Sequence, residues 1–381
     1  MNRIIYHIID AASGHHAPNV IKNTLQYTER CEISPDLHRF VLHNFDADLN
    51  LGLKEAIKDL DADKIIYVKK KDGWSGLRKL LVGLSKEKAG ILVHGINHYF
   101  LWFTLFTFSK KFLSRVVWIC WGAGTTRSVS IKTRFTADIA KKAVLHKVKY
   151  VVVLLKKDKE LLERHFKCKY VFVTPYMSQS IDFNSPIYQI KDTPKTVRNA
   201  VVRILIGNSA WETNNHHTIF DKLSPYKEER MDVLCPLSYG SADSTYADSV
   251  MKVGKKMFGE RFFPITQLLP TKDYMELIYS VDVIVIYSDR QMALFALYAG
   301  VNLGKKIVLK RSGANFDWFS SLGIKVFDFD DFPSFDSFVQ PLSQEDKLHN
   351  KLALTKLANF DVLAQNWKFI YKMLTVNENS I

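Results

Sequence analysis

A short stretch in the second half of the chain, residues 201–209, most constrains the fold. It reads Val-Val-Arg-Ile-Leu-Ile-Gly-Asn-Ser, so an apolar run breaks directly into a small polar turn. Continuous apolar runs of this length are typical of strands buried on both faces of a parallel sheet. Glycine permits a sharp turn, and a helix beginning near Asn214 would direct free N–H groups at an anion. The pattern therefore predicts a strand, loop and helix that hold a phosphorylated ligand, although an ordinary strand-to-helix turn would have the same pattern.

Composition narrows the class of protein. At 381 residues the chain is long enough for two domains, and 47% apolar content excludes a disordered polymer. The formal charge of +14 indicates an anionic partner, which could be nucleic acid, a membrane surface or a phosphorylated substrate. The cysteines form no CxxC pair, so we expect no zinc or redox motif and a reducing compartment.

No targeting or spanning segment is expected. The N-terminus opens into a strand-like run without the three regions of a signal peptide. The most apolar segment, residues 99–108, stops at Ser109 and is shorter than the roughly 20 residues that a spanning helix needs.

Strand-like and helix-like segments alternate along the chain. Strands are predicted at residues 3–9, 37–42, 64–68, 90–93, 116–119, 150–154, 170–173, 202–206, 231–236, 261–264, 283–286, 306–309 and 325–327. Helices are predicted at residues 19–27, 53–60, 75–84, 100–108, 136–146, 159–165, 215–223, 246–258, 271–280, 292–303 and 317–321, with a helical tail to residue 373. This alternation predicts an α/β protein with mostly parallel sheets.

The alternation is interrupted once, which predicts two domains. A stretch without periodicity, punctuated by Pro186 and Pro194, is interpreted as a linker at 181–199 between domains at 1–180 and 200–345. The tail, 346–381, is expected to cross back to the first domain. Two doubly wound (Rossmann-like) domains facing a cleft are the plan of GT-B glycosyltransferases, but periplasmic-type binding proteins and other two-domain enzymes share the alternation.

An ordered series of motifs makes the interpretation more specific. It comprises His7, Asp10, His15, His16, His94-Gly95, Trp102, Trp118, Trp121-Gly122-Ala123, Ile204 to Ser209, Asn214, His216, Pro236, Tyr239, Tyr246, Tyr274 to Leu277 and Arg290-Gln291. The series resembles the TDP-N-acetylfucosamine:lipid II N-acetylfucosaminyltransferases of enterobacterial common antigen synthesis, glycosyltransferase family 56. The likeness runs from about residue 4 to Trp367. It departs from the family at Ala293 and Phe295, where glycines are usual, and after Ala123, where acidic and tyrosine residues are absent.

The resemblance implies a reaction, a set of partners and a location. We expect an enzyme that moves a sugar, N-acetylfucosamine-like, from a nucleoside-diphosphate donor (TDP favoured) to a polyprenyl-diphosphate-linked glycan. Such an acceptor places the enzyme at the cytoplasmic face of the bacterial inner membrane, as a peripheral protein on an anionic surface. The Glu-x7-Glu pair of many retaining enzymes is missing between residues 282 and 313, which favours inversion.

The donor site is predicted in the second domain. The diphosphate gains negative charge as the glycosidic bond breaks, so it needs a metal or preorganised donors. Asp328-Phe329-Asp330 lies in an acidic loop that we interpret as solvated, so neither a metal nor a cofactor is expected. The residues assigned to the donor are Gly207, Asn208, Ser209, Tyr239 for the base, Arg290 and Lys310, with Arg311 a lesser candidate; the resemblance adds Asn214, His216, Tyr246 and Gln291. An Arg290–Asp289 surface ion pair and a core role for Tyr239 are the alternatives.

The general base is predicted in the first loop. Asp10, His15 and His16 follow the first strand within seven residues, and an unperturbed imidazole already titrates near neutral pH. A surface role for these histidines is the alternative. His94, at another strand end, is the next candidate.

A membrane contact is predicted at residues 100–112. Four aromatic residues there precede Lys110 and Lys111, and a basic block follows at Lys132, Arg134, Lys141, Lys142, Lys147 and Lys149. An aromatic face flanked by lysines suits a helix in a membrane interface, and a buried helix is the alternative. The charge would also suit a nucleic-acid-binding protein, but no recognition motif is present, so no nucleic-acid partner is expected. A non-catalytic module that binds sugar nucleotide or lipid is a third interpretation.

Overall fold

The chain divides into two compact units. The computed structural model describes residues 3–11, 16–45, 51–122, 124–125, 131–148, 150–168, 170–176, 201–240 and 245–375. The first unit contains Met1–Ser180 together with Phe360–Ile381, and the second contains Ile181–Asn359. The first unit is therefore assembled from both ends of the chain, whereas the second is one continuous stretch.

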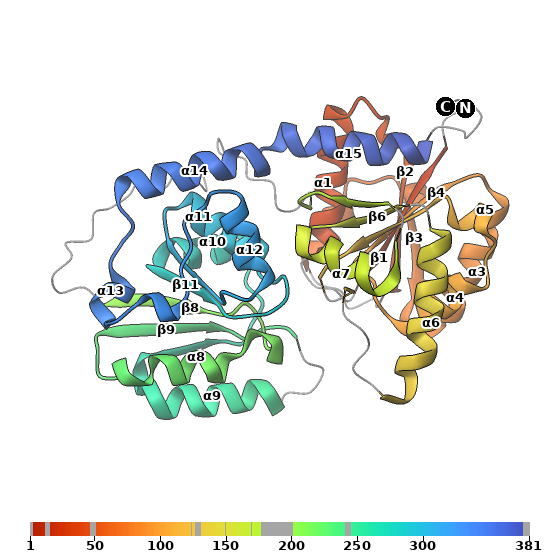
Figure 1. The fold of residues 1–381 in the computed structure, drawn as a ribbon. Helices are drawn as coiled ribbons and strands as arrows, with labels where there is room; N and C mark the ends of the chain where they lie inside the picture. The colour runs from red at the N-terminus through yellow and green to blue at the C-terminus, as the bar shows by residue number, and fades with distance from the viewer. Residues whose placement is uncertain are drawn as a thin grey trace. The chain divides into compact units, whose positions relative to one another are not determined.

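The first unit is built on a parallel sheet. Its described strands, labelled in part in Figure 1, are ordered β3-β2-β1-β4-β5-β6-β7 and are all parallel. Successive strands are added on one side of β1 as far as β3 and on the other side from β4 onward, so the strand order reverses between β1 and β4. The strands are β1 (Ile5–Asp10), β2 (His38–Phe45), β3 (Ile65–Lys69), β4 (Gly90–His94), β5 (Val116–Cys120), β6 (Tyr150–Val153) and β7 (Val171–Val173). In open parallel sheets, ligands bind beyond the carboxyl ends of the strands at such a reversal.

Helices alternate with these strands. They are α1 (His16–Arg30), α2 (Leu51–Ile57), α3 (Gly73–Lys86), α4 (Tyr99–Phe106), α5 (Lys110–Leu113), α6 (Ile131–Lys147), α7 (Lys156–Phe166) and the returning α15 (Phe360–Thr375). Leu77, Leu81 and Leu84 recur at helical spacing on α3 and are all buried, which explains why this segment forms an amphipathic helix. Each such apolar stripe completes the core beside the sheet.

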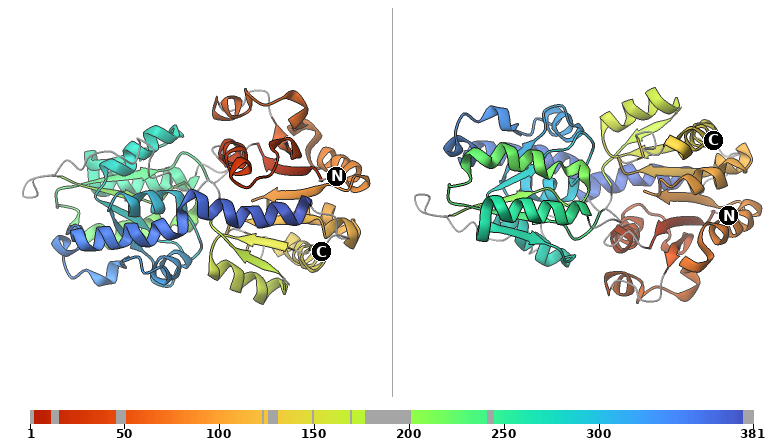
Figure 2. Two further views of the ribbon diagram at one scale, coloured as in Figure 1. Left: turned by 90° about the horizontal axis from the view of Figure 1, so that it is seen from above. Right: turned by 90° about the horizontal axis from the view of Figure 1, so that it is seen from below.

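Helix α15 completes the first unit from the far end of the chain. It packs against α1, β1 and β4, as the views in Figure 2 show. The amide of Arg3 donates to the carbonyl of Thr375 at 3.2 Å, so the start of β1 and the end of α15 lie side by side. Trp367 and Tyr371 of α15 are fully buried.

The second unit repeats the plan with a smaller parallel sheet, ordered β10-β9-β8-β11-β12. Its strands are β8 (Val202–Ile206), β9 (Met231–Pro236), β10 (Phe262–Ile265), β11 (Val283–Ile286) and β12 (Lys306–Leu309). Its α-helices are α8 (His216–Leu223), α9 (Thr245–Phe258), α10 (Thr271–Ser280), α11 (Leu294–Asn302), α12 (Ala314–Ser321), α13 (Phe335–Val339) and α14 (Gln344–Ala358). The strand order reverses between β8 and β11, so the turn after β8 lies at the point where parallel sheets bind ligands.

The predicted α/β class is confirmed, and most elements lie where the pattern predicts them. Two segments differ. Residues 325–327 form no strand, since only Phe327 makes an isolated bridge to Val308. The tail is two helices rather than one, because Asn359 separates α14 in the second unit from α15 in the first. The predicted linker, 181–199, lies outside the described residues.

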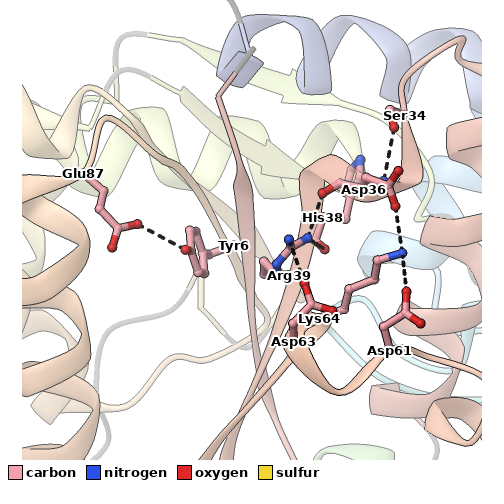
Figure 3. Close-up of polar contacts among 9 residues, drawn as sticks. All are labelled: Tyr6, Ser34, Asp36, His38, Arg39, Asp61, Asp63, Lys64 and Glu87. Carbon is pink, nitrogen blue, oxygen red and sulfur yellow. Dashed lines mark hydrogen bonds and ion pairs between the residues drawn. The ribbon is translucent and has the colours of Figure 1, made fainter. Parts of the chain in front are cut away.

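Ion pairs lie near the amino ends of the strands in the first sheet. Figure 3 shows Lys64 bridging Asp36 at 2.8 Å and Asp61 at 3.1 Å, with Arg39 paired to Asp63 at 3.1 Å. Tyr6 donates to Glu87 at 3.1 Å on the other side of β1. Polar groups at this edge are thus engaged with one another, and the chemistry is expected at the carboxyl edge.

Helix α4 presents one aromatic face to solvent. Leu101, Trp102 and Leu105 are buried, whereas the aromatic face, made of Tyr99, Phe100, Phe103 and Phe106, is 36–47% exposed. The segment therefore combines both predicted interpretations, a buried side and an open side. No helix in the described part of the chain has the length and apolarity to cross a membrane.

Candidate functional site

The turn after β8 depends on glycine. Gly207 has a φ of +68°, a conformation that side chains other than glycine adopt at a cost, and its amide donates to the carbonyl of Val285 at 2.9 Å. A Cβ atom at this position would lie 2.5 Å from Nε2 of His216. The turn therefore packs directly onto the imidazole at the start of α8.

Asn214 closes the turn from inside. Its Oδ1 accepts from the amide of Asn208 at 3.3 Å. Its Nδ2 donates to the carbonyl and to Oγ of Ser209, at 2.9 and 3.1 Å. Asn214 and Ser209 are fully buried, so the side chains shape the loop instead of meeting solvent. The structure thus brings together the predicted donor residues Gly207, Asn208, Ser209, Asn214 and His216.

His216 is held as a neutral imidazole. The backbone amide of His216 donates to the hydroxyl of Tyr246 at 3.3 Å. The same hydroxyl lies 3.1 Å from Nδ1 of His216. The tyrosine oxygen accepts the amide and its proton can point at Nδ1, an arrangement in which the imidazole carries its proton on Nε2. Burial lowers the pKa of His216 to about 3. Nε2 has no hydrogen-bond partner among the described residues.

Tyr239 joins the same cluster from the neighbouring strand. Asn208 Nδ2 donates to its hydroxyl at 2.7 Å, and the amide of Ala210 donates to its carbonyl at 2.6 Å. Burial raises the pKa of Tyr239 to about 12, so it stays protonated. Tyr239 as a whole residue is half-buried. Oδ1 of Asn208 is buried and has no partner in the described part of the chain.

Arg290, Gln291 and Lys310 lie in the loops after β11 and β12. Lys310 pairs with Asp289 at 2.6 Å, so the alternative partner considered for Arg290 is engaged by another cation. Arg290 and Gln291 are half-buried, and Ala293, which begins α11, has a φ of +56°. Arg311 pairs with Asp331, and its amide donates to Asp328 at 2.6 Å.

The acidic loop differs from the solvated loop that was predicted. Asp328 is 2% exposed, because its carboxylate accepts the amides of Arg311 and Asp330 and caps a short 3₁₀ helix, Phe329–Asp331. Asp330 is exposed and pairs with Lys222 at 2.9 Å. The described residues contain no group of three or more potential metal ligands.

Asp10 ends β1 at the carboxyl edge of the first sheet. Its Oδ1 accepts from Asn44 at 3.2 Å. The negative charge of Asp10 raises the pKa values of His43 and His98, although burial, the larger effect, lowers both. Asp10 is therefore close to His43, its register partner on β2, and to His98 in the loop after β4. His15 lies outside the described residues, and His16 begins α1 with its side chain undescribed.

His43, His98 and Trp74 were missed by the sequence analysis. The ring of Trp74 lies 4.5 Å from that of His43 and stacks on that of His98 at 5.0 Å. His43 is fully buried, and a hydrogen bond with the backbone of Gly73 opposes the effect of burial on its pKa. Like Asp10, His43 is at a strand end, and His98 follows the next strand of the reversal. Applying the strand-end rule to every strand would have found both.

His94 lies inside a different cluster. Its Nε2 is 3.0 Å from Nδ1 of His7, whose Nε2 is 2.7 Å from Nδ1 of His38, and its own Nδ1 contacts the hydroxyl of Tyr176. Burial lowers the pKa of His94 and of His38 to about 3 and holds that of His7 well below its usual range. Both ring nitrogens of His94 are engaged, which leaves it no nitrogen for a substrate.

The comparisons with known proteins agree with this architecture. A family model described as 4-alpha-L-fucosyltransferase, glycosyl transferase group 56, matches residues 2–332. A glycosyltransferase from Rickettsia africae is 13% identical, with a TM-score of 0.65 and 98% of each chain covered. Sucrose-phosphate synthase from Thermosynechococcus elongatus is 11% identical, with a TM-score of 0.64 and coverage of 98% of this chain and 99% of that one. HepE from Anabaena, solved in complex with UDP and glucose, is 10% identical, with a TM-score of 0.65 and coverage of 98% and 100%. At such identities the three structures show the fold alone.

Proposed function

The chain belongs to the 4-alpha-L-fucosyltransferase family, glycosyl transferase group 56, and from this premise we propose a specific transfer. The enzyme is a glycosyltransferase of the GT-B fold. In our proposal it moves an N-acetylfucosamine-like sugar from a TDP donor to a lipid-diphosphate-linked saccharide, without a metal. The observation that carries the proposal is the closed turn after β8, where the predicted donor residues meet.

The turn after β8 supports a diphosphate site. It precedes α8 and lies where the strand order of a parallel sheet reverses, which is where such sheets bind ligands. The Nε2–H of His216 is a neutral donor beside the glycine, and the charge of Arg290 follows the adjacent strand. The HepE complex with UDP has the same fold, which supports a nucleoside diphosphate as the ligand class. Tyr239, which is half-buried and hydrogen-bonded to Asn208, is the aromatic residue proposed for the pyrimidine base.

Metal independence is proposed because fixed donors can replace the cation. Leaving-group charge can be stabilised by backbone amides, a neutral imidazole N–H and a guanidinium. Asp328, the buried carboxylate of the acidic loop, is already occupied by two backbone amides. We expect transfer to survive excess EDTA, and a complete loss that magnesium restores would contradict this part of the proposal.

The acceptor is assigned to the carboxyl edge of the first sheet, with Asp10 as the leading general base. Asp10 has two histidines nearby that a sequential proton transfer could use. His15 and His16 stay predictions. The aromatic face of α4, with exposed Lys110 and Lys111 following it, is proposed to rest on the anionic inner-membrane surface from the cytoplasmic side.

Ligand binding tests the donor assignment directly. We expect calorimetry to detect TDP, and a thermal-shift screen of UDP, TDP and GDP sugars to rank TDP sugars first. Arg290→Ala should weaken TDP binding by about 10–150-fold, since a hydrogen bond from a charged group contributes roughly 1.5–3 kcal/mol. Arg311→Ala is the matched control, because Arg311 is engaged with Asp331. Parental TDP affinity in Arg290→Ala would place the diphosphate elsewhere.

Vesicle flotation tests the membrane assignment. The protein should float with anionic vesicles at low salt and be released by high salt or carbonate, because a peripheral contact combines charge with shallow apolar burial. Reversing the charges of Lys110 and Lys111 should weaken flotation, whereas reversing Lys252 on α9, in the other unit, should not. Retention through carbonate washing would rule out a purely peripheral contact.

A further inference from the structure

A lysine is buried in the interior of the first unit. Lys141, on α6, is 3% exposed. Its Nζ lies over three aromatic rings, 5.2 Å from the centre of Trp102, 4.9 Å from Trp118 and 4.6 Å from Phe166. Lys141 was predicted to belong to the basic block beside the membrane contact, but its burial removes it from any such surface. An interior ammonium costs several kcal/mol unless nearby groups compensate it, so its partners must be considered.

Those partners belong to two loops at the carboxyl edge of the sheet. Nζ donates to the carbonyl of Gly124, after β5, and to Oδ1 of Asn97, after β4, the latter at 3.1 Å. Oδ1 of Asn97 also accepts from Nε1 of Trp102 at 3.2 Å. One ammonium thus joins the loops that follow the paired strands β4 and β5.

The space around Gly124 is closed. A Cβ atom on Gly124 would lie 2.7 Å from the ring of Trp118 and 2.8 Å from Sγ of Cys120. Thr125 continues the turn, because its amide and its Oγ1 donate to the carbonyl of Gly122 at 3.0 and 2.7 Å. The loop after β5 therefore presents its carbonyl to Lys141 from a tightly packed turn.

The groups that face Lys141 leave it charged at neutral pH. Burial lowers its pKa to about 8, opposed by Cys120 on β5, Asp138 on its own helix and Cys168 after α7. The charge of Asp158, on α7, also raises the pKa of Cys120. Burial raises the pKa of Cys120 and of Cys168, so both thiols are neutral. The cation is stabilised mainly by carbonyl oxygens and ring faces.

The loop after β4 connects Lys141 with the carboxyl ends of the strands in the first sheet, where the acceptor is proposed to bind. Asn97 precedes His98, whose ring stacks on Trp74, and Trp74 contacts His43 beside Asp10. We propose that Lys141 is a positioning residue, which fixes the loops after β4 and β5 and thereby sets His98 and the adjoining aromatic face for acceptor binding. This inference rests on the proposed function only in naming the acceptor as the ligand of that edge.

Kinetics provide the first test. Lys141→Met keeps a long unbranched side chain but removes the ammonium. With an undecaprenyl-diphosphate-linked saccharide as acceptor, we expect its kcat/KM to fall by roughly 10–100-fold, the scale of a misplacement near 1 Å. TDP affinity should stay parental, and Lys141→Arg should recover part of the loss because it keeps a cation with several N–H donors. Lys79→Met, on the exposed side of α3, is the control for losing one lysine.

Hydrogen exchange provides a second test that needs no substrate. In Lys141→Met, the amides of residues 95–98 and of Gly124 and Thr125 should exchange at least about tenfold faster, with the rest of the first unit near parental rates. Because this readout involves no transfer, its failure is distinct from a failure of the proposed function. Parental protection in both loops would overturn the proposal, and so would a uniform loss of protection across the first unit.

A milder variant covers the outcome in which Lys141→Met does not fold. Asn97→Ala removes one acceptor and leaves the ammonium on the carbonyl of Gly124. Faster exchange in residues 95–98 alone, with parental rates at Gly124 and Thr125, supports the proposal. Parental rates in both loops of Asn97→Ala overturn it. Where Lys141→Met does fold, a double-mutant cycle of the two substitutions should show that their losses are not fully additive, since both remove the hydrogen bond between Asn97 and Lys141.

Discussion

Both units bury histidine next to their first strand, but they use it differently. In the first unit, three histidines form a chain of side-chain contacts across β2, β1 and β4: His38, His7 and His94. In the second, His216 sits beneath the turn of Gly207 with Nε2 unpartnered among the described residues. Burial keeps all four imidazoles neutral, so the lowered pKa does not distinguish them. What distinguishes them is whether a ring nitrogen remains for a ligand.

The largest expected difference between the two units is in how their stability changes at acid pH. An unfolded histidine takes up a proton below pH about 6.5, whereas the buried ones resist protonation to about pH 3. The unfolded state thus binds more protons in this window, so stability is full above pH 6.5 and declines as the pH falls. The first unit buries three such histidines and the second buries one, so the stability of the first unit should fall more steeply as the pH is lowered.

Hydrogen exchange between pH 7 and pH 4, corrected for the intrinsic rate, would measure this difference. We expect β1, β2 and β4 to lose protection at a higher pH than β8 and β11. Intrinsic fluorescence gives a second readout, since five of the seven tryptophans are in the first unit. Earlier loss of the second sheet would show that the histidine chain does not control acid stability.

Replacing the predicted base should separate catalysis from donor binding. Asp10→Asn should lower turnover by about 10²–10⁴-fold, because the amide cannot accept the acceptor's proton. TDP affinity should remain parental in calorimetry, since the donor residues belong to the other unit. His94→Gln serves as the comparison, and its effect should be on stability more than on turnover. If Asp10→Asn keeps near-parental turnover while His94→Gln loses it, the roles are reversed.

Two glycine substitutions separate the effect of side-chain size from that of backbone conformation at the turn of the second unit. Gly207→Val adds a strained positive φ and a clash with His216, so TDP binding should weaken by at least about 100-fold. Gly259→Val is the matched control, because Gly259 has a φ of +60° and a Cβ atom there would meet nothing within 4 Å. Its effect should be limited to the backbone strain of about 1–2 kcal/mol in thermal unfolding. Equal TDP affinity in the two variants would remove the turn from the donor site.

The smallest expected effect concerns a residue where this chain departs from its family. Ala293 begins α11 with a φ of +56°, a conformation that glycine adopts without the cost of a Cβ. Ala293→Gly should therefore stabilise the second unit by about 1 kcal/mol, measured by denaturant unfolding. Ala296→Gly, inside the same helix, should instead destabilise it by a similar amount. A destabilising Ala293→Gly would mean that the strain is absent or is compensated locally.

Much of the second sheet was predictable because its strands are short, mostly apolar runs. Residues 202–206, 231–236, 283–286 and 306–309 were predicted with the bounds that the structure has. The turn of Gly207 followed from the same signal. The predicted strand at 325–327 failed because only Phe327 pairs with a neighbour. Local pattern thus predicts an element but not whether a neighbouring strand is within reach.

The histidine chain and the buried lysine were not predictable in the same way. His38 is opposite Ile5 and His94 opposite Ile9, so both reach His7 diagonally across a register that the sequence does not reveal. In the sequence Lys141 is one member of a basic run, and its burial depends on Trp102, Trp118 and Phe166 from three other elements. Side chains whose environment comes from distant segments require the fold before their roles can be assigned.

The return of α15 to the first unit sets an order for folding during synthesis. The second unit is continuous, so it can be completed while the ribosome is still making the last helix. The first unit cannot, because Tyr371 covers His38 at a ring distance of 5.1 Å and Trp367 donates to the carbonyl of Pro175 at 3.3 Å. Until α15 emerges, the face of β1 and β4 that it covers stays open to water and to chaperones. A nascent chain stopped before residue 360 should therefore carry a protease-resistant second unit and a protease-sensitive first one.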